Sequence, residues 1–99
     1  MITQTKKTVR IIKRKINDNE FEGTATVLEK NGLREYIYDY PFAREIKKNL
    51  VNGDLKKISK KLGLSQCFIT SVLDGVRFNE GILAEAMVIG NYNKENNYI

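Results

Sequence analysis

The stretch LKKISKKLGLSQCFITSVLDG, at residues 55–75, decides the fold. Its first apolar residues, Leu55, Ile58 and Leu62, recur at the spacing of one face of a helix. Gly63 follows them, and a glycine at the end of a helix readily takes the left-handed conformation that a tight turn needs. We therefore predict a short helix that ends at Leu62.

A second helix is predicted immediately after this turn. Ser65 is a preferred N-cap residue, and Ile69, Val72 and Leu73 supply the helix with an apolar face. The Asp-Gly pair at residues 74–75 ends it. Two short helices joined by a turn of about three residues form a helix-turn-helix, a pattern that also occurs in helical hairpins without a DNA-binding role.

The stretch resembles the helix-turn-helix of DNA-binding domains of the Cro/C1, or phage-repressor, type. The residues that match the family pattern are Ile58, Ser59, Leu62, Gly63, Leu64, Ser65, Ile69, Leu73 and Gly75. The family often continues with a basic residue, an asparagine and another helix, and Arg77, Asn79 and the pair Ile82-Leu83 fit that continuation. The resemblance covers residues 42–90.

Three features depart from the family pattern. Ser59 stands where alanine or glycine is usual, and Gly81 lies near the place where a proline often opens the following helix. The strand-like region in front of the motif is not part of the simple family domain, which suggests an added module.

That region reads as three strands, at residues 8–16, 21–29 and 33–40. Asn31-Gly32 is a strong hairpin signal, because a type I′ turn needs positive φ at both central residues. We therefore predict an α+β fold, in which a three-stranded antiparallel sheet precedes a four-helix helix-turn-helix domain. The helices are expected to cover the apolar face of the sheet.

The other two helices are predicted from their end signals. Pro41 opens a helix that Asn52-Gly53 ends, and Asp54 is the expected N-cap of the next helix. Asn79 is expected to cap a last helix that ends at Gly90-Asn91. The predicted divisions are a basic arm and β-meander at 1–40, the helix-turn-helix domain at 41–90 and a loose Asn-rich tail at 91–99.

The net charge is +5, and the positive charge is concentrated in two blocks. Residues 1–16 hold six basic residues and residues 55–64 hold four lysines, and neither block contains an acidic residue. The first block could be a solvated face, a strand against phosphate, or an arm at residues 1–7 that enters a minor groove. Three tyrosines at alternate positions could form a stacking platform, although a face packed on a helix or a dimer interface is favoured: Tyr36, Tyr38 and Tyr40.

The family resemblance implies that the second helix lies in the major groove while the first crosses the DNA backbone. Phe68 is interpreted as a core residue, and Cys67 as an outward or half-buried residue rather than a reactive thiol. Gln66 could bond adenine through N6 and N7. The candidate base contacts are Gln66, Cys67, Thr70 and Ser71. The candidate phosphate contacts are Lys56, Lys57, Lys60, Lys61, Ser65, Arg77 and Asn79.

These features favour a sequence-specific double-stranded DNA-binding protein, a small phage or bacterial transcriptional regulator that acts as a homodimer. The alternative is a protein–protein interaction module, antitoxin-like or phage-structural, that keeps the helix-turn-helix core without binding DNA. An enzyme is not expected, because the chain has no histidine, no phosphate-binding glycine loop and no paired carboxylates at a credible site.

We expect no cofactor, metal, small-molecule ligand or membrane partner, and no transmembrane helix or signal-peptide core. The single cysteine, Cys67, cannot form an internal disulfide and fits a reducing compartment. The expected location is therefore the cytoplasm, in association with the nucleoid.

Overall fold

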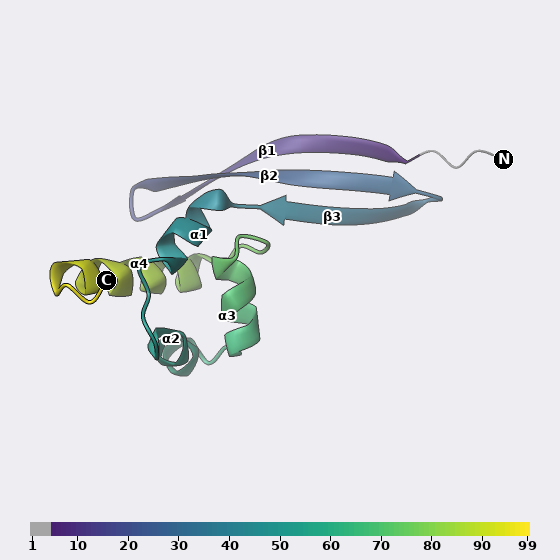
Figure 1. Ribbon diagram of the computed structural model, residues 1–99. Coiled ribbons are helices and arrows are strands. Elements are labelled where there is room, and N and C mark those ends of the chain that lie inside the picture. The colour runs from purple at the N-terminus through teal and green to yellow at the C-terminus, as the bar shows by residue number, and fades with distance from the viewer. Residues whose placement is uncertain (1–4) are drawn as a thin grey trace.

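The computed structural model describes residues 5–99, and there it has three strands followed by four helices, which confirms the predicted α+β order (Figure 1). The strands are β1 (Lys6–Ile16), β2 (Asn19–Lys30) and β3 (Leu33–Asp39). The helices are α1 (Pro41–Lys47), α2 (Asp54–Leu62), α3 (Gln66–Leu73) and α4 (Glu80–Glu95). No helix in this part of the chain is long and apolar enough to cross a membrane.

The sheet is an antiparallel meander in the order β1-β2-β3, joined by two tight turns. Asn31 and Gly32 both have positive φ, at 53° and 77°, as the type I′ prediction requires. Asn17 and Asp18 also have positive φ, at 48° and 64°. Asparagine and aspartate tolerate this conformation better than other non-glycine residues, so the first turn can be as short as the second.

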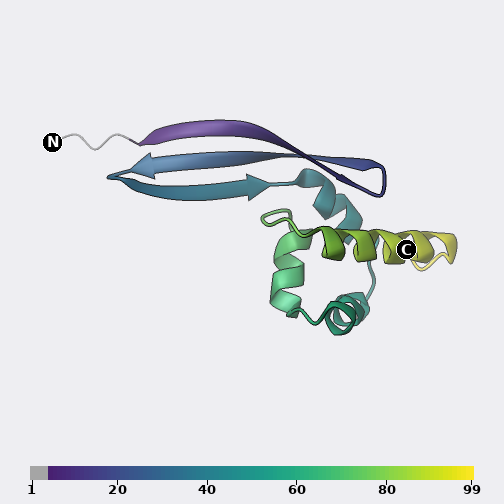
Figure 2. The same cartoon turned by 180° about the vertical axis from the view of Figure 1, so that it is seen from behind.

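The helices cover only the end of the sheet that lies at the β1–β2 turn, so the prediction that they cover its apolar face is wrong for most of its length. Figures 1 and 2 show the opposite end of the sheet extending past the helices. Tyr36 and Tyr38, on the face that the helices cover at the other end, are 52% and 37% exposed there. The reason is length: strands of 11 and 12 residues are longer than the short helices beneath them can span.

The core forms where the covered end of the sheet meets the helices. Ile16 and Phe21 from the sheet are buried together with Ile69 of α3 and Ile82 of α4. Tyr40, immediately after β3, is also buried, and its backbone N–H donates to the carbonyl oxygen of Gly75 at 2.8 Å. The sheet is therefore tied to the loop that follows α3.

The end of α1 and the start of α2 differ from the prediction. α1 ends at Lys47, not at residue 51, because the amides of Asn49 and Leu50 bond three residues back in successive tight turns. Gly53, with φ at 93°, is the N-cap of α2, and Asp54 is its first residue. The Asp54 carboxylate instead turns back and accepts a hydrogen bond from the Val51 N–H at 2.8 Å.

α4 continues to Glu95, so the predicted helix end at residues 90–91 and much of the predicted loose tail are wrong. Gly90 lets the helix approach the segment after α1 closely, since a Cβ at this position would lie 3.0 Å from the Asn49 Cβ. Asn93 is buried and its side-chain amide donates to the Asn49 carbonyl oxygen at 2.8 Å and to Asp54 Oδ2 at 2.9 Å. These buried hydrogen bonds stabilise the last turns of the helix.

Candidate nucleic-acid interface

α2 and α3 are joined by a three-residue turn that its own side chains hold in place. Gly63 has φ at 67° and caps α2, and Ser65 Oγ accepts a hydrogen bond from the Phe68 N–H at 3.2 Å, as predicted for an N-cap. Ser59 Oγ donates to the Leu64 carbonyl oxygen at 2.6 Å. Ser59, which departs from the family pattern, therefore adds a hydrogen bond that alanine or glycine could not make.

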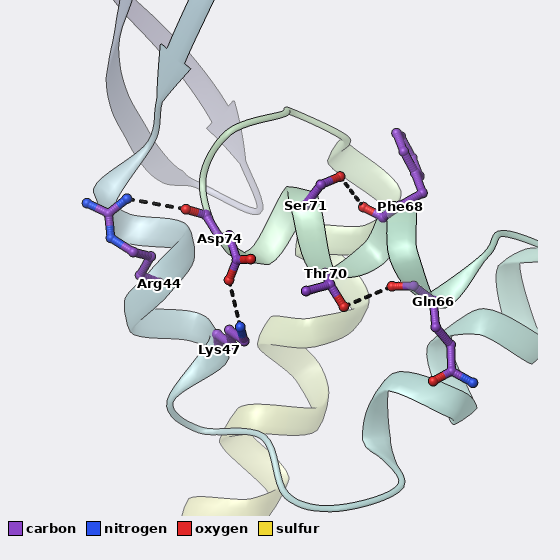
Figure 3. Close-up of polar contacts among 7 residues, drawn as sticks. All are labelled: Arg44, Lys47, Gln66, Phe68, Thr70, Ser71 and Asp74. Carbon is purple, nitrogen blue, oxygen red and sulfur yellow. Dashed lines mark hydrogen bonds and ion pairs between the residues drawn. The ribbon is translucent and has the colours of Figure 1, made fainter.

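The four candidate base contacts share the side of α3 that faces away from the core. Gln66 and Cys67 are exposed, whereas Thr70 and Ser71 are half-buried. Thr70 Oγ1 donates to the Gln66 carbonyl oxygen at 2.9 Å, and Ser71 Oγ donates to the Phe68 carbonyl oxygen at 2.7 Å (Figure 3). Both hydroxyl hydrogens are thus used within the helix, and their oxygens are left as acceptors.

Gln66 differs from its neighbours because its side-chain amide extends from the first turn of α3 away from the rest of the helix (Figure 3). It lines a hollow of about 460 Å³ together with Lys47 of α1 and Lys56 of α2. Two lysines and an amide with both a donor and an acceptor therefore border one hollow, and the Lys47 ammonium in it is already paired with Asp74. Lys47 was not predicted, because only the packing of α1 beside α3 brings it to this position.

The four lysines of α2 are all exposed but do not face the same way. Lys56 and Lys60 are one turn apart, and Lys56 borders the hollow beside Gln66. Lys61 Nζ lies 2.9 Å from Glu85 Oε1 of α4, and Lys57 Nζ lies 3.8 Å from Asp54 Oδ1. Lys57 also borders a separate hollow next to the end of α4. Lys56 and Lys60 are therefore better placed than the other two for an anion held at α3.

Of the remaining candidate phosphate contacts, Ser65 lies at the start of α3, and Arg77 and Asn79 lie in the segment between α3 and α4. Ser65 and Asn79 are N-caps, so their side-chain oxygens already accept backbone N–H groups. The Arg77 guanidinium is exposed and lies 5.9 Å from the ring centroid of Phe68. Phe68 is partly buried against the core, which agrees with its interpretation as a core residue.

An acidic group at the end of α3 is neutralised within the protein. Asp74 Oδ1 lies 2.6 Å from Lys47 Nζ, and its carbonyl oxygen accepts a hydrogen bond from Arg44 Nη1 at 3.3 Å (Figure 3). Arg44 Nη1 also lies 2.7 Å from Asp39 Oδ1. The charge of Asp74 is thereby compensated on the exposed side of the helix.

The residues of the predicted arm do not all lie outside the sheet, and the three tyrosines of the predicted row do not all lie on the surface. Lys6 and Lys7 belong to β1, and residues 1–4 of the predicted arm lie outside the described residues. Tyr36 and Tyr38 are exposed and stack with ring centroids 6.4 Å apart. Tyr40 instead lies in the core, where burial raises the pKa of its phenol above the usual 10.0, Arg14 lowers it and Tyr38 raises it.

Within residues 5–99, no group of three or more cysteine, aspartate or glutamate side chains is placed to hold a metal ion. Comparison of the chain with protein-family models, curated proteins and solved structures found no match. The class of protein is therefore inferred from the residues and their geometry.

Proposed function

We propose that this protein binds double-stranded DNA and reads its sequence in the major groove with α3, as a small transcriptional regulator of phage or bacterial type. The observation that carries the proposal is the exposed Gln66 amide at the first turn of α3, beside Lys56. Helix-turn-helix proteins contact bases with the N-terminal residues of the second helix. Gln66 occupies that position.

The candidate side chains divide into base-reading and phosphate-binding groups. The Gln66 amide has the geometry to donate to adenine N7 and accept from adenine N6 in a bidentate pair. Thr70 and Ser71 offer acceptor oxygens one turn further along the helix. Lys56 and Lys60 of α2, and Arg77 beside Phe68, are exposed cations that would neutralise phosphates and release counterions.

Helix-turn-helix modules usually bind as dimers to two half-sites about 34 Å apart. The proposed binding form is accordingly a homodimer on a site with two-fold symmetry. Such a regulator acts in the cytoplasm, in association with the nucleoid.

Selection of bound sequences from a pool of random duplexes tests base reading directly. With Gln66→Ala we expect the preference at one base position per half-site to be lost, at a cost of about 1–3 kcal/mol. Asn91→Ala is the matched control, because Asn91 is an exposed amide on α4, away from α3. An unchanged base preference in Gln66→Ala would show that α3 does not read bases through this residue.

One observation favours a second candidate function, a protein–protein interaction module without DNA binding. The sheet exposes Val9, Ile11 and Ile37 on one face, which is unusual for a free surface. A mobility-shift assay at low salt separates the two functions. No shift with any duplex, together with a large stable assembly in light scattering, would favour the interaction module.

A further inference from the structure

The two faces of the sheet differ in charge. Residues that lie directly opposite in the strand register share a face. One face, which we name the basic face, has a single acidic residue, Glu29, and that residue pairs with Arg34 at 3.3 Å. Its basic residues are Lys6, Arg10, Arg14 and Arg34. The other face balances Lys7, Lys13, Lys15 and Lys30 against Glu20, Glu22, Glu35 and Asp39.

The basic face also carries hydrogen-bond donors beside its cations. Arg10, Arg14, Tyr36 and Tyr38 border a surface hollow of about 410 Å³. The two tyrosine rings are nearly parallel, with an interplanar angle of 11°, and both are exposed. Guanidinium groups and phenol hydroxyls are donors that proteins commonly use to bind phosphate oxygens.

The basic face looks toward the helices on the side of α3. It is the face that carries Ile16 and Phe21 into the helical core. Figures 1 and 2 both show the free end of the sheet extending on the side where α3 lies, while the C-terminal end of α4 lies on the opposite side. The Arg14 guanidinium lies 5.9 Å from the ring centroid of Phe78, in the segment between α3 and α4. The basic face therefore continues toward the helix that is proposed to read bases.

The length of the sheet suits a duplex. The basic residues that β1 contributes to this face run from Lys6 to Arg14, a distance of about 26 Å at about 3.3 Å per residue, which is most of one turn of B-DNA at about 34 Å. A duplex seated on α3 would thus have a positively charged face along most of one turn.

We propose that the basic face binds the sugar–phosphate backbone of the same duplex whose bases α3 reads. The inference rests on the proposed function and adds a second, sequence-independent contact surface to it. Charge complementarity supports this occupant, because the basic face has a net charge of +3 and the opposite face has none. Two copies of the chain that pair through their basic faces would bring like charges together.

Two double variants of β1 with equal charge change test the proposal. Lys6→Ser with Arg10→Ser alters the basic face, and Lys7→Ser with Lys15→Ser alters the opposite face of the same strand. All four residues are exposed, and none takes part in a salt bridge among the described residues. Circular dichroism and thermal unfolding establish that both proteins fold.

Fluorescence anisotropy on the selected duplex, of about 30 base pairs or three turns, then gives log K against log salt. The basic-face variant is expected to shallow the slope by about 1.8, since each phosphate contact contributes about 0.9, and to keep the wild-type base preference. The control variant is expected to change the slope by less than half as much. Tyr36→Phe with Tyr38→Phe, which removes only the hydroxyls, is expected to weaken binding several-fold.

Four results would overturn the inference. Equal slope changes in the two double variants would indicate a general effect of net charge. An unchanged slope with loss of self-association in sedimentation would assign the basic face to a second copy. If the wild-type protein binds no duplex, the proposed function fails and this inference fails with it. If the wild-type protein reads bases through Gln66 but the basic-face variant keeps the wild-type slope, this inference alone is refuted.

Discussion

At the scale of single residues, Tyr40 is the point where the sheet joins the helices. Its ring lies against Gly23 of β2, and its backbone carbonyl lies against Gly75 after α3. A Cβ at position 23 would lie 2.5 Å both from the Asp39 carbonyl oxygen and from Tyr40 Cδ1. The strand pattern around Gly23 is regular, so the sequence has no signal that this glycine faces an aromatic ring.

Gly23→Ala is expected to lower the free energy of unfolding by about 1–3 kcal/mol, because the added methyl group overpacks a site formed partly by backbone. Urea denaturation measures the change. Gly81→Ala is the control: its nearest contact would be Asn79 Oδ1 at 3.4 Å, and alanine favours the helix by up to about 1 kcal/mol. Equal effects of the two substitutions would contradict the packing described for Tyr40.

The burial of Tyr40 also predicts that the stability of the protein depends on pH. Burial raises the pKa of Tyr40 in the folded protein above its usual 10.0. The Tyr40 phenol therefore ionises at a lower pH in the unfolded chain than in the folded protein. The contribution of Tyr40 to stability is intact below about pH 10 and is lost as the pH rises toward the folded pKa. Denaturation between about pH 9 and 11 should show a steeper loss for wild type than for Tyr40→Phe. Parallel curves for the two proteins would refute the shift.

At the scale of elements, the sequence predicts helix ends well when local capping determines them. Ser65, Gly63 and Asn79 act as expected, because each bonds a backbone group within a few residues. The ends of α1 and α4 were predicted wrongly because contacts between elements decide them. Asp54 and Asn93 lie 39 positions apart, and their buried hydrogen bond extends α4 beyond Gly90.

Asn93→Ala is expected to destabilise the protein by about 1–3 kcal/mol, since it removes the donor to a carboxylate that is only 2% exposed. Hydrogen exchange should show the loss concentrated in the last two turns of α4 and in the segment before α2. Asn91→Ala, on the exposed side of the same helix, should leave both nearly unchanged. A uniform loss across the chain in both variants would contradict a local role for Asn93.

At the scale of the whole molecule, the unexpected feature is a sheet that is mostly uncovered. Strand order and turns follow from the sequence, because alternation and Asn-Gly are local signals. Which part of the sheet the helices cover depends on how Tyr40 and Phe21 dock, and the sequence pattern does not contain that information. The candidate base contacts of α3 could be predicted from one helix, whereas Lys47 and the basic face depend on tertiary arrangement.

The central claim, that Gln66 reads an adenine in the major groove, has one direct test. Replacing that adenine with 7-deazaadenine in the selected duplex removes the N7 acceptor without changing base pairing. We expect the replacement to weaken binding of the wild-type protein by about 1–3 kcal/mol and to leave binding of Gln66→Ala unchanged, because the pair is already lost. The same loss in both proteins, or no loss in either, would contradict the claim.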